Sequence, residues 1–134
     1  MTSNQTVRLI NPTTIHKPTG YSHIAEVKSG RMVFISGQVA LDINGNMVGV
    51  GDFRAQAVQV FENLKAALES VGADFSHIVK FNYYIVEKNA LPIVREVRNQ
   101  YINVEQPPAS TAVYVSDLAR EGFLLEIEAV AVIP

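Results

Sequence analysis

The chain of 134 residues contains no cysteine. This absence excludes disulfide bonds, thiolate nucleophiles and cysteine-ligated metal sites. No apolar run approaches the roughly 20 residues that cross a bilayer, so we expect no membrane partner. The first residues also lack the basic start and apolar stretch of a signal peptide. We therefore expect a cytoplasmic protein.

An excess of positive charge is also lacking. Eleven Lys and Arg residues stand against thirteen Asp and Glu, which gives a net charge of -2. The basic residues are scattered, and none of their groupings could follow a phosphate backbone, so we expect no nucleic-acid partner. His16, His23 and His77 do not have the spacing of metal ligands, and we expect neither a metal nor a cofactor.

The composition is that of a globular protein. Hydrophobic residues make up 48% of the chain and charged residues 18%, proportions that favour a folded core over disorder. The length fits one domain, and no linker, repeat or low-complexity tract divides it. We predict a single domain over residues 1–134.

Strand and turn signals fill the first third of the chain. Residues 7–10 predict a short first strand. The β-favouring runs 22–27 and 32–36 flank Ser29-Gly30, which predicts a hairpin turn. Asn44-Gly45 is the strongest turn signal in the sequence.

The clearest helix is predicted from about residue 52 to residue 71. Asp52 is a suitable N-cap and Gly72 a suitable helix end. Polar residues at Gln56, Gln59, Glu62, Asn63 and Glu69 are expected mostly on the solvent side. The expected apolar face comprises Ala57, Val60, Phe61, Leu64, Ala67, Leu68 and Val71.

The second half of the sequence alternates strand and helix signals. Residues 77–87 predict a strand, and residues 90–102 a helix with Pro92 in its first turn. Strands are predicted at 111–115 and 124–134. The order predicts an α+β fold with a mixed β-sheet and two helices packed on one face. The second helix is expected to face the sheet with Leu91, Val94, Val97 and Tyr101.

The last strand gives information about assembly. Alternation sends Leu125, Ile127, Ala129 and Ala131 toward one face, which we expect to lie under the helices. The other face carries Leu124, Glu126, Glu128, Val130 and Val132. That second face is too apolar for water, and two helices cannot cover both sides of a sheet. We therefore predict an oligomer packed sheet against sheet, with Glu126 or Glu128 near the interface.

Five segments in the same order resemble the YjgF/RidA family of enamine and imine hydrolases. They are "PTGYSH", "MVFISGQV", "QAVQVFENLKAALESVGADFSHIVK", "PPASTAVYV" and "LLEIEAVAV", and together they cover nearly the whole chain. The resemblance implies a chorismate-mutase-like fold and a homotrimer. It also implies three inter-subunit clefts, each of which binds a small-molecule metabolite.

One position departs from the family pattern. Active members carry Pro-Ala-Arg where this chain has Pro108-Ala109-Ser110. The resemblance implies that this arginine grips the substrate carboxylate, for which the paired N–H donors of a guanidinium are well suited. Serine offers one neutral hydrogen bond instead. Each candidate for a replacement cation is better explained as solvated surface charge, and nothing in the chain selects one among Lys17, Arg31, Arg54, Arg95 and Arg98.

At the other site positions, this chain matches the family pattern better. The resemblance implies that Glu126 orients the attacking water, that Tyr21 lines the cleft and that the Gly37 backbone approaches the ligand. Ala112 stands where many members have a cysteine whose backbone N–H contacts substrate, and Arg95 stands near a family asparagine. Structural alternatives remain for several of these residues: an ion pair for Glu126, aromatic packing for Tyr21 and a β-bulge for Gly37.

Glu128 is interpreted as structural, with a partner from the neighbouring subunit as one option. Ser110 is not expected to act as a nucleophile, because no histidine lies near it in the sequence and no nucleophile-elbow motif surrounds it.

These observations give two main hypotheses for function. The first is hydrolysis of an imine or enamine other than the usual 2-imino acids, with Glu126 positioning water. The alternative is a non-catalytic trimer that binds a metabolite. A third hypothesis follows from the family's older label as an endoribonuclease, and the acidic charge argues against it.

Overall fold

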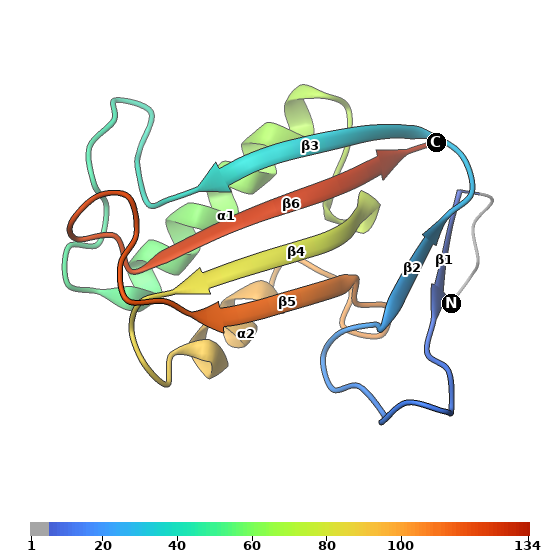
Figure 1. Cartoon of the computed structure of the whole chain (residues 1–134). Coiled ribbons are helices and arrows are strands. Elements are labelled where there is room, and N and C mark those ends of the chain that lie inside the picture. The colour runs from blue at the N-terminus through green and yellow to red at the C-terminus, as the bar shows by residue number, and fades with distance from the viewer. Residues whose placement is uncertain (1–5) are drawn as a thin grey trace.

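A computed structural model describes residues 6–134, and residues 1–5 of the predicted domain lie outside this range. Its main sheet has the strand order β3 (Arg31–Gln38), β6 (Leu125–Ile133), β4 (Ile78–Ile85) and β5 (Ala109–Tyr114) (Figure 1). Strands β4 and β5 are parallel, and the other neighbours are antiparallel.

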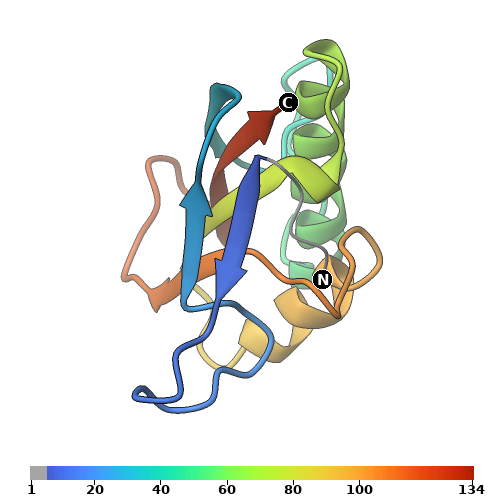
Figure 2. The same cartoon turned by 90° about the vertical axis from the view of Figure 1, so that its right-hand side faces the viewer.

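The helices α1 (Phe53–Ser70) and α2 (Leu91–Arg98) lie on the same side of the main sheet (Figure 2). A short 3-10 helix, η1 (Phe75–His77), leads into β4. The predicted α+β fold with a mixed sheet and two helices on one face is confirmed. Neither α1 nor α2, the helices found within residues 6–134, is long and apolar enough to cross a bilayer.

Helix α1 begins and ends as its capping residues predict. The Asp52 carboxylate accepts a hydrogen bond from the Ala55 backbone N–H at 3.1 Å. At the other end Gly72 adopts φ +75°, and the Ala73 N–H donates to the Leu68 carbonyl at 2.9 Å, which closes the last turn. The predicted apolar face is buried in the core, except that Ala67 is partly buried and Val71 is exposed.

Gln56 was expected on the solvent side of α1 but is fully buried. Its amide nitrogen donates to the carbonyls of Gly49 and Gly122, at 3.1 and 2.9 Å, and its amide oxygen accepts from the Leu124 N–H at 2.9 Å. A buried amide is tolerated because these groups satisfy it. Gln56 thus fastens two loops to the helix.

The hairpin predicted at Ser29-Gly30 is wrong. Strand β2 (Ile24–Val27) pairs with β1 (Val7–Ile10) in a separate two-stranded sheet, whereas β3 pairs with β6. The chain passes from one sheet to the other at Gly30, which has φ +111°. A Cβ atom at Gly30 would lie 2.8 Å from the Ile133 carbonyl oxygen. The close approach therefore requires glycine.

The alternation predicted for β6 is confirmed. The four residues expected under the helices are buried in the core, while Glu126, Glu128 and Val130 face the opposite side and are half-buried. Val132 also belongs to that side but is buried. On the neighbouring strand β3, Phe34 pairs with Val130 and is 73% exposed. This outer face of the sheet is partly apolar in the single chain.

Helix α2 is shorter than predicted, because residues 99–102 form turns. Pro92 lies in the first turn as expected, and Val94 and Val97 are buried. Leu91 and Tyr101 pack against the core and are partly buried. Arg98, which was interpreted as surface charge, is also buried.

Candidate functional site

A small pocket lies between α2, the sheet and the loop that carries Tyr21. Its volume is about 30 Å³, enough for about two water-sized groups. It brings together three of the predicted site residues, Tyr21, Ser110 and Ala112. The remaining lining residues are Thr19, Gly20, Tyr83, Leu91, Val94, Arg95 and Arg98.

Strand pairing places Ser110 and Ala112 on the helix side of the sheet. In the parallel pair β4–β5, Ser110 lies opposite Phe81 and Ala112 opposite Tyr83. Phe81 and Tyr83 belong to the core under the helices, and paired residues of neighbouring strands project from the same face. Ser110 therefore lies inside β5 and faces the pocket rather than the outer face.

The loop with Tyr21 is fastened to the start of β5. The Ser22 N–H donates to the Pro108 carbonyl at 3.1 Å, and the Ser22 hydroxyl donates to the Pro107 carbonyl at 2.6 Å. The Tyr21 hydroxyl lies 3.0 Å from His16 Nε2. The His23 ring packs edge-on against the rings of both His16 and Tyr21. These two histidines brace Tyr21.

Arg98, a candidate cation that was interpreted as surface charge, is a buried polar residue of the pocket. It is 7% exposed, and its Nη1 donates to the Gly20 carbonyl at 2.8 Å. Its Nε and Nη2 donate to Asn99 Oδ1 at 3.2 and 2.9 Å. A signal was available: Arg98 follows Leu91 and Val94 at the spacing of one helix face.

Tyr83 contributes a buried hydroxyl to the pocket wall. It is 3% exposed, and its hydroxyl makes no well-formed hydrogen bond within residues 6–134, although the Arg98 guanidinium lies close to it. Burial raises the pKa of the Tyr83 hydroxyl well above its ordinary value, and the nearby charges of Arg98 and Arg95 oppose this rise. The Tyr83 hydroxyl therefore stays protonated near neutral pH and can donate a hydrogen bond to a ligand.

Of the five candidate cations, Arg95 and Arg98 line this pocket. Arg54 pairs with Glu96 at 3.1 Å on the helix surface. Arg31 is exposed at the start of β3, and Lys17 lines a separate surface hollow. The interpretation as solvated surface charge is wrong for Arg98, because it is buried.

Glu126 and Gly37 lie together on the opposite face of the sheet. Glu126 is paired with Tyr84, whose neighbour Tyr83 points into the core. A Cβ atom at Gly37 would stand 1.9 Å from Glu126 Oε2. The register of β3 shifts between Ile35 and Gln38, so Gly37 lies in a β-bulge. The carboxylate of Glu126 thus rests directly on the Gly37 backbone.

Within one chain, then, the two groups of predicted site residues lie on opposite faces. Ser110 and Tyr21 face the helix-side pocket, whereas Glu126 borders an open hollow on the outer face with Tyr84 and Glu128. A single copy of the chain cannot bring both groups to one ligand.

Glu128, two residues along β6, is held within its own chain. Its Oε1 accepts hydrogen bonds from the Tyr84 hydroxyl and, at 3.0 Å, from the Asn82 amide. These bonds, that of Tyr84 foremost, lower the pKa of Glu128. They agree with the structural role expected for Glu128, and its pairing across subunits stays a prediction.

Replacement Tyr84→Phe is expected to reduce stability in a pH-dependent way. Since the folded-state pKa of Glu128 is lowered, its contribution is present above the ordinary pKa of 4.5 and is lost as pH falls through the folded-state value. The difference in free energy of unfolding between wild type and variant should therefore be larger at about pH 7 than at about pH 3. Urea unfolding at both pH values measures it, and an equal difference would contradict the assignment.

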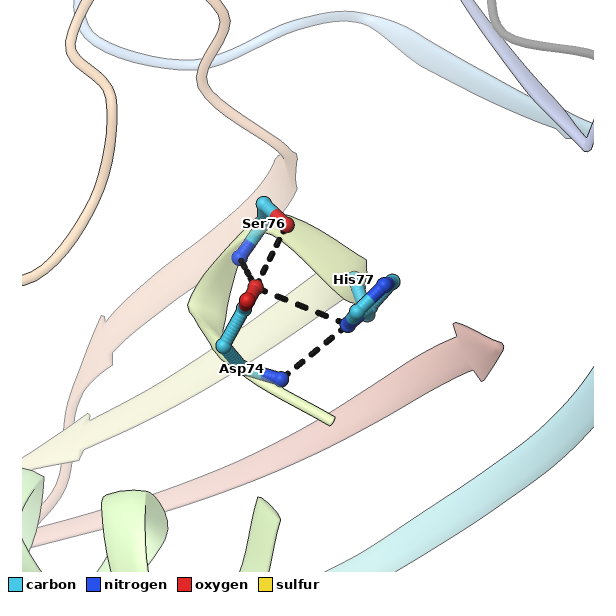
Figure 3. A network of polar contacts seen from close by, with 3 residues as sticks. All are labelled: Asp74, Ser76 and His77. Atoms are coloured by element: carbon cyan, nitrogen blue, oxygen red, sulfur yellow. Dashed lines mark hydrogen bonds and ion pairs between the residues drawn. The ribbon is translucent and has the colours of Figure 1, made fainter. Parts of the chain in front are cut away.

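A second polar cluster, in η1, is structural (Figure 3). The Ser76 N–H and hydroxyl both donate to Asp74, and the Asp74 N–H donates to His77 Nδ1 at 3.0 Å. The bond from Ser76 lowers the pKa of Asp74. Because the serine hydroxyl points to the carboxylate instead of the imidazole, this cluster is not a nucleophilic triad. It caps the 3-10 helix.

No group of three or more metal-binding side chains is placed to hold an ion within residues 6–134.

Comparisons with known proteins show which family this chain resembles. The model of the Endoribonuclease L-PSP family matches residues 13–133. Protein DfrA of Myxococcus xanthus is 42% identical over 112 residues, which cover 84% of each chain. A 2-iminobutanoate/2-iminopropanoate deaminase of Dermatophagoides farinae is 34% identical over 127 residues, which cover 94% of this chain and 96% of the relative.

The fold has a close counterpart among solved structures. A Yersinia pestis protein of unknown function from the conserved Rid family, YyfB, superposes with a TM-score of 0.84 at 36% identity. The match covers 96% of this chain and 100% of that one. The chorismate-mutase-like α+β fold expected from the resemblance is therefore confirmed, and the chain belongs to the YjgF/RidA family, whose family model is that of Endoribonuclease L-PSP.

Proposed function

We propose that the protein hydrolyses an imine or enamine in clefts formed between neighbouring copies of the chain. The observation that carries this proposal is the Glu126 carboxylate, which rests on Gly37 and borders an open hollow on the outer face of the sheet. A relative that spans almost the whole chain is named a 2-iminobutanoate/2-iminopropanoate deaminase.

The cleft we propose combines the two groups of site residues from different subunits. One copy supplies the pocket with Tyr21, Ser110 and Ala112, and the next supplies Gly37 and Glu126. The exposed apolar side chains of the outer face, Phe34 above all, support self-association because they would leave water in the assembly. We propose a homotrimer, the closed ring that the family resemblance implies.

Glu126 would act on the water and on the leaving nitrogen. As the water oxygen bonds to the imine carbon, Glu126 takes one water proton and the C=N electron pair moves to nitrogen. The carboxyl group then gives that proton to nitrogen. Loss of ammonia follows as Glu126 carries the hydroxyl proton of this intermediate to nitrogen and the carbonyl forms.

The direct test is ammonia release from 2-iminobutanoate generated in the assay. We expect release above the spontaneous rate, and that release should scale with protein concentration. No acceleration with this imine, with an enamine such as 2-aminoacrylate or with an imine that has no carboxylate would contradict the proposal.

The alternative of a non-catalytic binding trimer is favoured by one observation, the serine at position 110 in place of the family arginine. A thermal-shift screen of small metabolites separates the two functions, because a ligand that binds the folded state raises the melting temperature. A ligand recovered unchanged supports binding alone, and one that is consumed supports hydrolysis.

A further inference from the structure

The charged side chains of the helix-side pocket are both positive, and its other polar side chains are neutral hydroxyls that can donate hydrogen bonds. Arg95 and Arg98 bring guanidinium groups, and Tyr83 brings a buried hydroxyl that makes no well-formed hydrogen bond within residues 6–134 and lies beside Arg98. Ser110 and Tyr21 add further hydroxyls to the lining, and that of Tyr21 also contacts His16. None of the described residues that line the pocket has a carboxylate side chain. Such a set of groups suits a ligand that accepts hydrogen bonds and carries negative charge.

Arg98 gives the strongest indication that the pocket binds an anion. A buried cation is costly unless an anion or several good acceptors accompany it. The ion pairs found within residues 6–134 are Arg8–Glu26 and Arg54–Glu96, together with Asp74–His77 when that histidine is protonated, and Arg98 belongs to none of them. Its acceptors are one carbonyl and one amide oxygen, both neutral. The buried positive charge therefore lacks a counter-ion in the described chain.

Arg95 adds a second charge at the mouth of the pocket. It lies three residues before Arg98, so both side chains project from the same side of α2. Arg95 is exposed and takes no part in the ion pairs of residues 6–134. Helix α2 thus presents two guanidinium groups at one pocket, which Ser110 also lines.

We propose that Arg98 and Arg95 form an anion anchor that holds the carboxylate of the ligand, in place of the arginine that Ser110 replaces. The proposal rests on the proposed function, since it assigns the substrate class of the same cleft. It replaces the expectation, drawn from Ser110 alone, of a substrate other than a 2-imino acid. The pocket has room for about two water-sized groups, which fits the two oxygens of a carboxylate better than the four of phosphate.

The test uses the wild-type protein and two unreactive probes, 2-oxobutanoate and its neutral counterpart 2-oxobutanamide. We expect the acid to bind about ten-fold more tightly than the amide in an NMR titration, because charge-assisted bonds are stronger than neutral ones. Inorganic phosphate should compete weakly. Equal affinity for acid and amide would overturn the anchor, and so would tighter binding of phosphate than of the acid.

Variants of Arg95 and Arg98 test whether these residues form the anchor. Arg95→Gln and Arg98→Gln should each weaken 2-oxobutanoate binding by about ten-fold and leave 2-oxobutanamide binding nearly unchanged. The matched control Arg54→Gln removes an arginine from the surface of α1 and should leave both affinities at the wild-type value. Since Arg95 is exposed, its variant tests the anchor even if Arg98→Gln does not fold. Unchanged acid binding in Arg95→Gln would overturn its role in the anchor.

The two proposals can fail separately. If the acid binds through the arginines but no imine is hydrolysed, the anchor stands and the hydrolase proposal is wrong. If imines are hydrolysed while the Arg95 and Arg98 variants bind acid and amide as the wild type does, the hydrolase stands and the anchor is wrong.

Discussion

Replacement Glu126→Gln is expected to lower the rate of imine hydrolysis by about 10²- to 10⁴-fold, the usual contribution of a general acid–base. Glutamine keeps the size and the hydrogen-bonding atoms of the side chain but cannot take a proton from water. Within residues 6–134, the Glu126 carboxylate makes no hydrogen bond or ion pair that the change would break. The free energy of unfolding should therefore change by less than about 0.5 kcal/mol.

The matched control is Glu128→Gln, on the same strand and the same face. Glu128 is engaged by Tyr84 and Asn82, so we assign it no part in the reaction. Its variant should retain a rate within about three-fold of the wild type, as expected for a residue outside the chemistry. Steady-state ammonia release compares the two variants, and equal losses would show that Glu126 has no special role.

Replacement Gly37→Ala is expected to reduce hydrolysis by about 10²-fold, because catalytic groups displaced by about 1 Å lose that much. The new Cβ atom would stand 1.9 Å from Glu126 Oε2 and 2.8 Å from its Cδ. The side chain must therefore turn away. Since the displaced atoms are the end of a flexible side chain, the melting temperature should fall only slightly.

The double variant Gly37→Ala/Glu126→Gln separates displacement of the carboxylate from other effects. If alanine acts by moving Glu126, the double variant should be no slower than Glu126→Gln alone, because the two changes remove one function. Additive losses in kcat/KM would contradict this mechanism and assign a separate role to the Gly37 backbone.

Local patterns predicted much of the fold. The capping residues Asp52 and Gly72 determined the ends of α1, and the period-two pattern of β6 assigned its faces correctly. These features depend on residues close in sequence. The partner of β2 was predicted wrongly, because short β-favouring runs carry no information about which distant strand they join. Here the glycine at position 30 directs the chain to another sheet.

The residues of the candidate site were predicted only in part, for a similar reason. The family resemblance selected Tyr21, Gly37, Ser110, Ala112 and Glu126, and the structure places them in two groups on opposite faces. Arg98 was named as a candidate cation but interpreted as surface charge, because arginine is usually an exposed residue. Its burial depends on the Gly20 carbonyl, which lies far away in sequence.

The measurement that tests the account most directly is recovery of activity when two inactive variants are refolded together. Glu126→Gln retains the pocket, and Ser110→Phe fills the pocket but retains Glu126. If each cleft joins the pocket of one copy to the glutamate of the next, random mixing should restore about a quarter of the wild-type rate, since about one cleft in four combines two intact halves. A mixture no more active than its two parents would show that the reaction, if any, is confined to single chains.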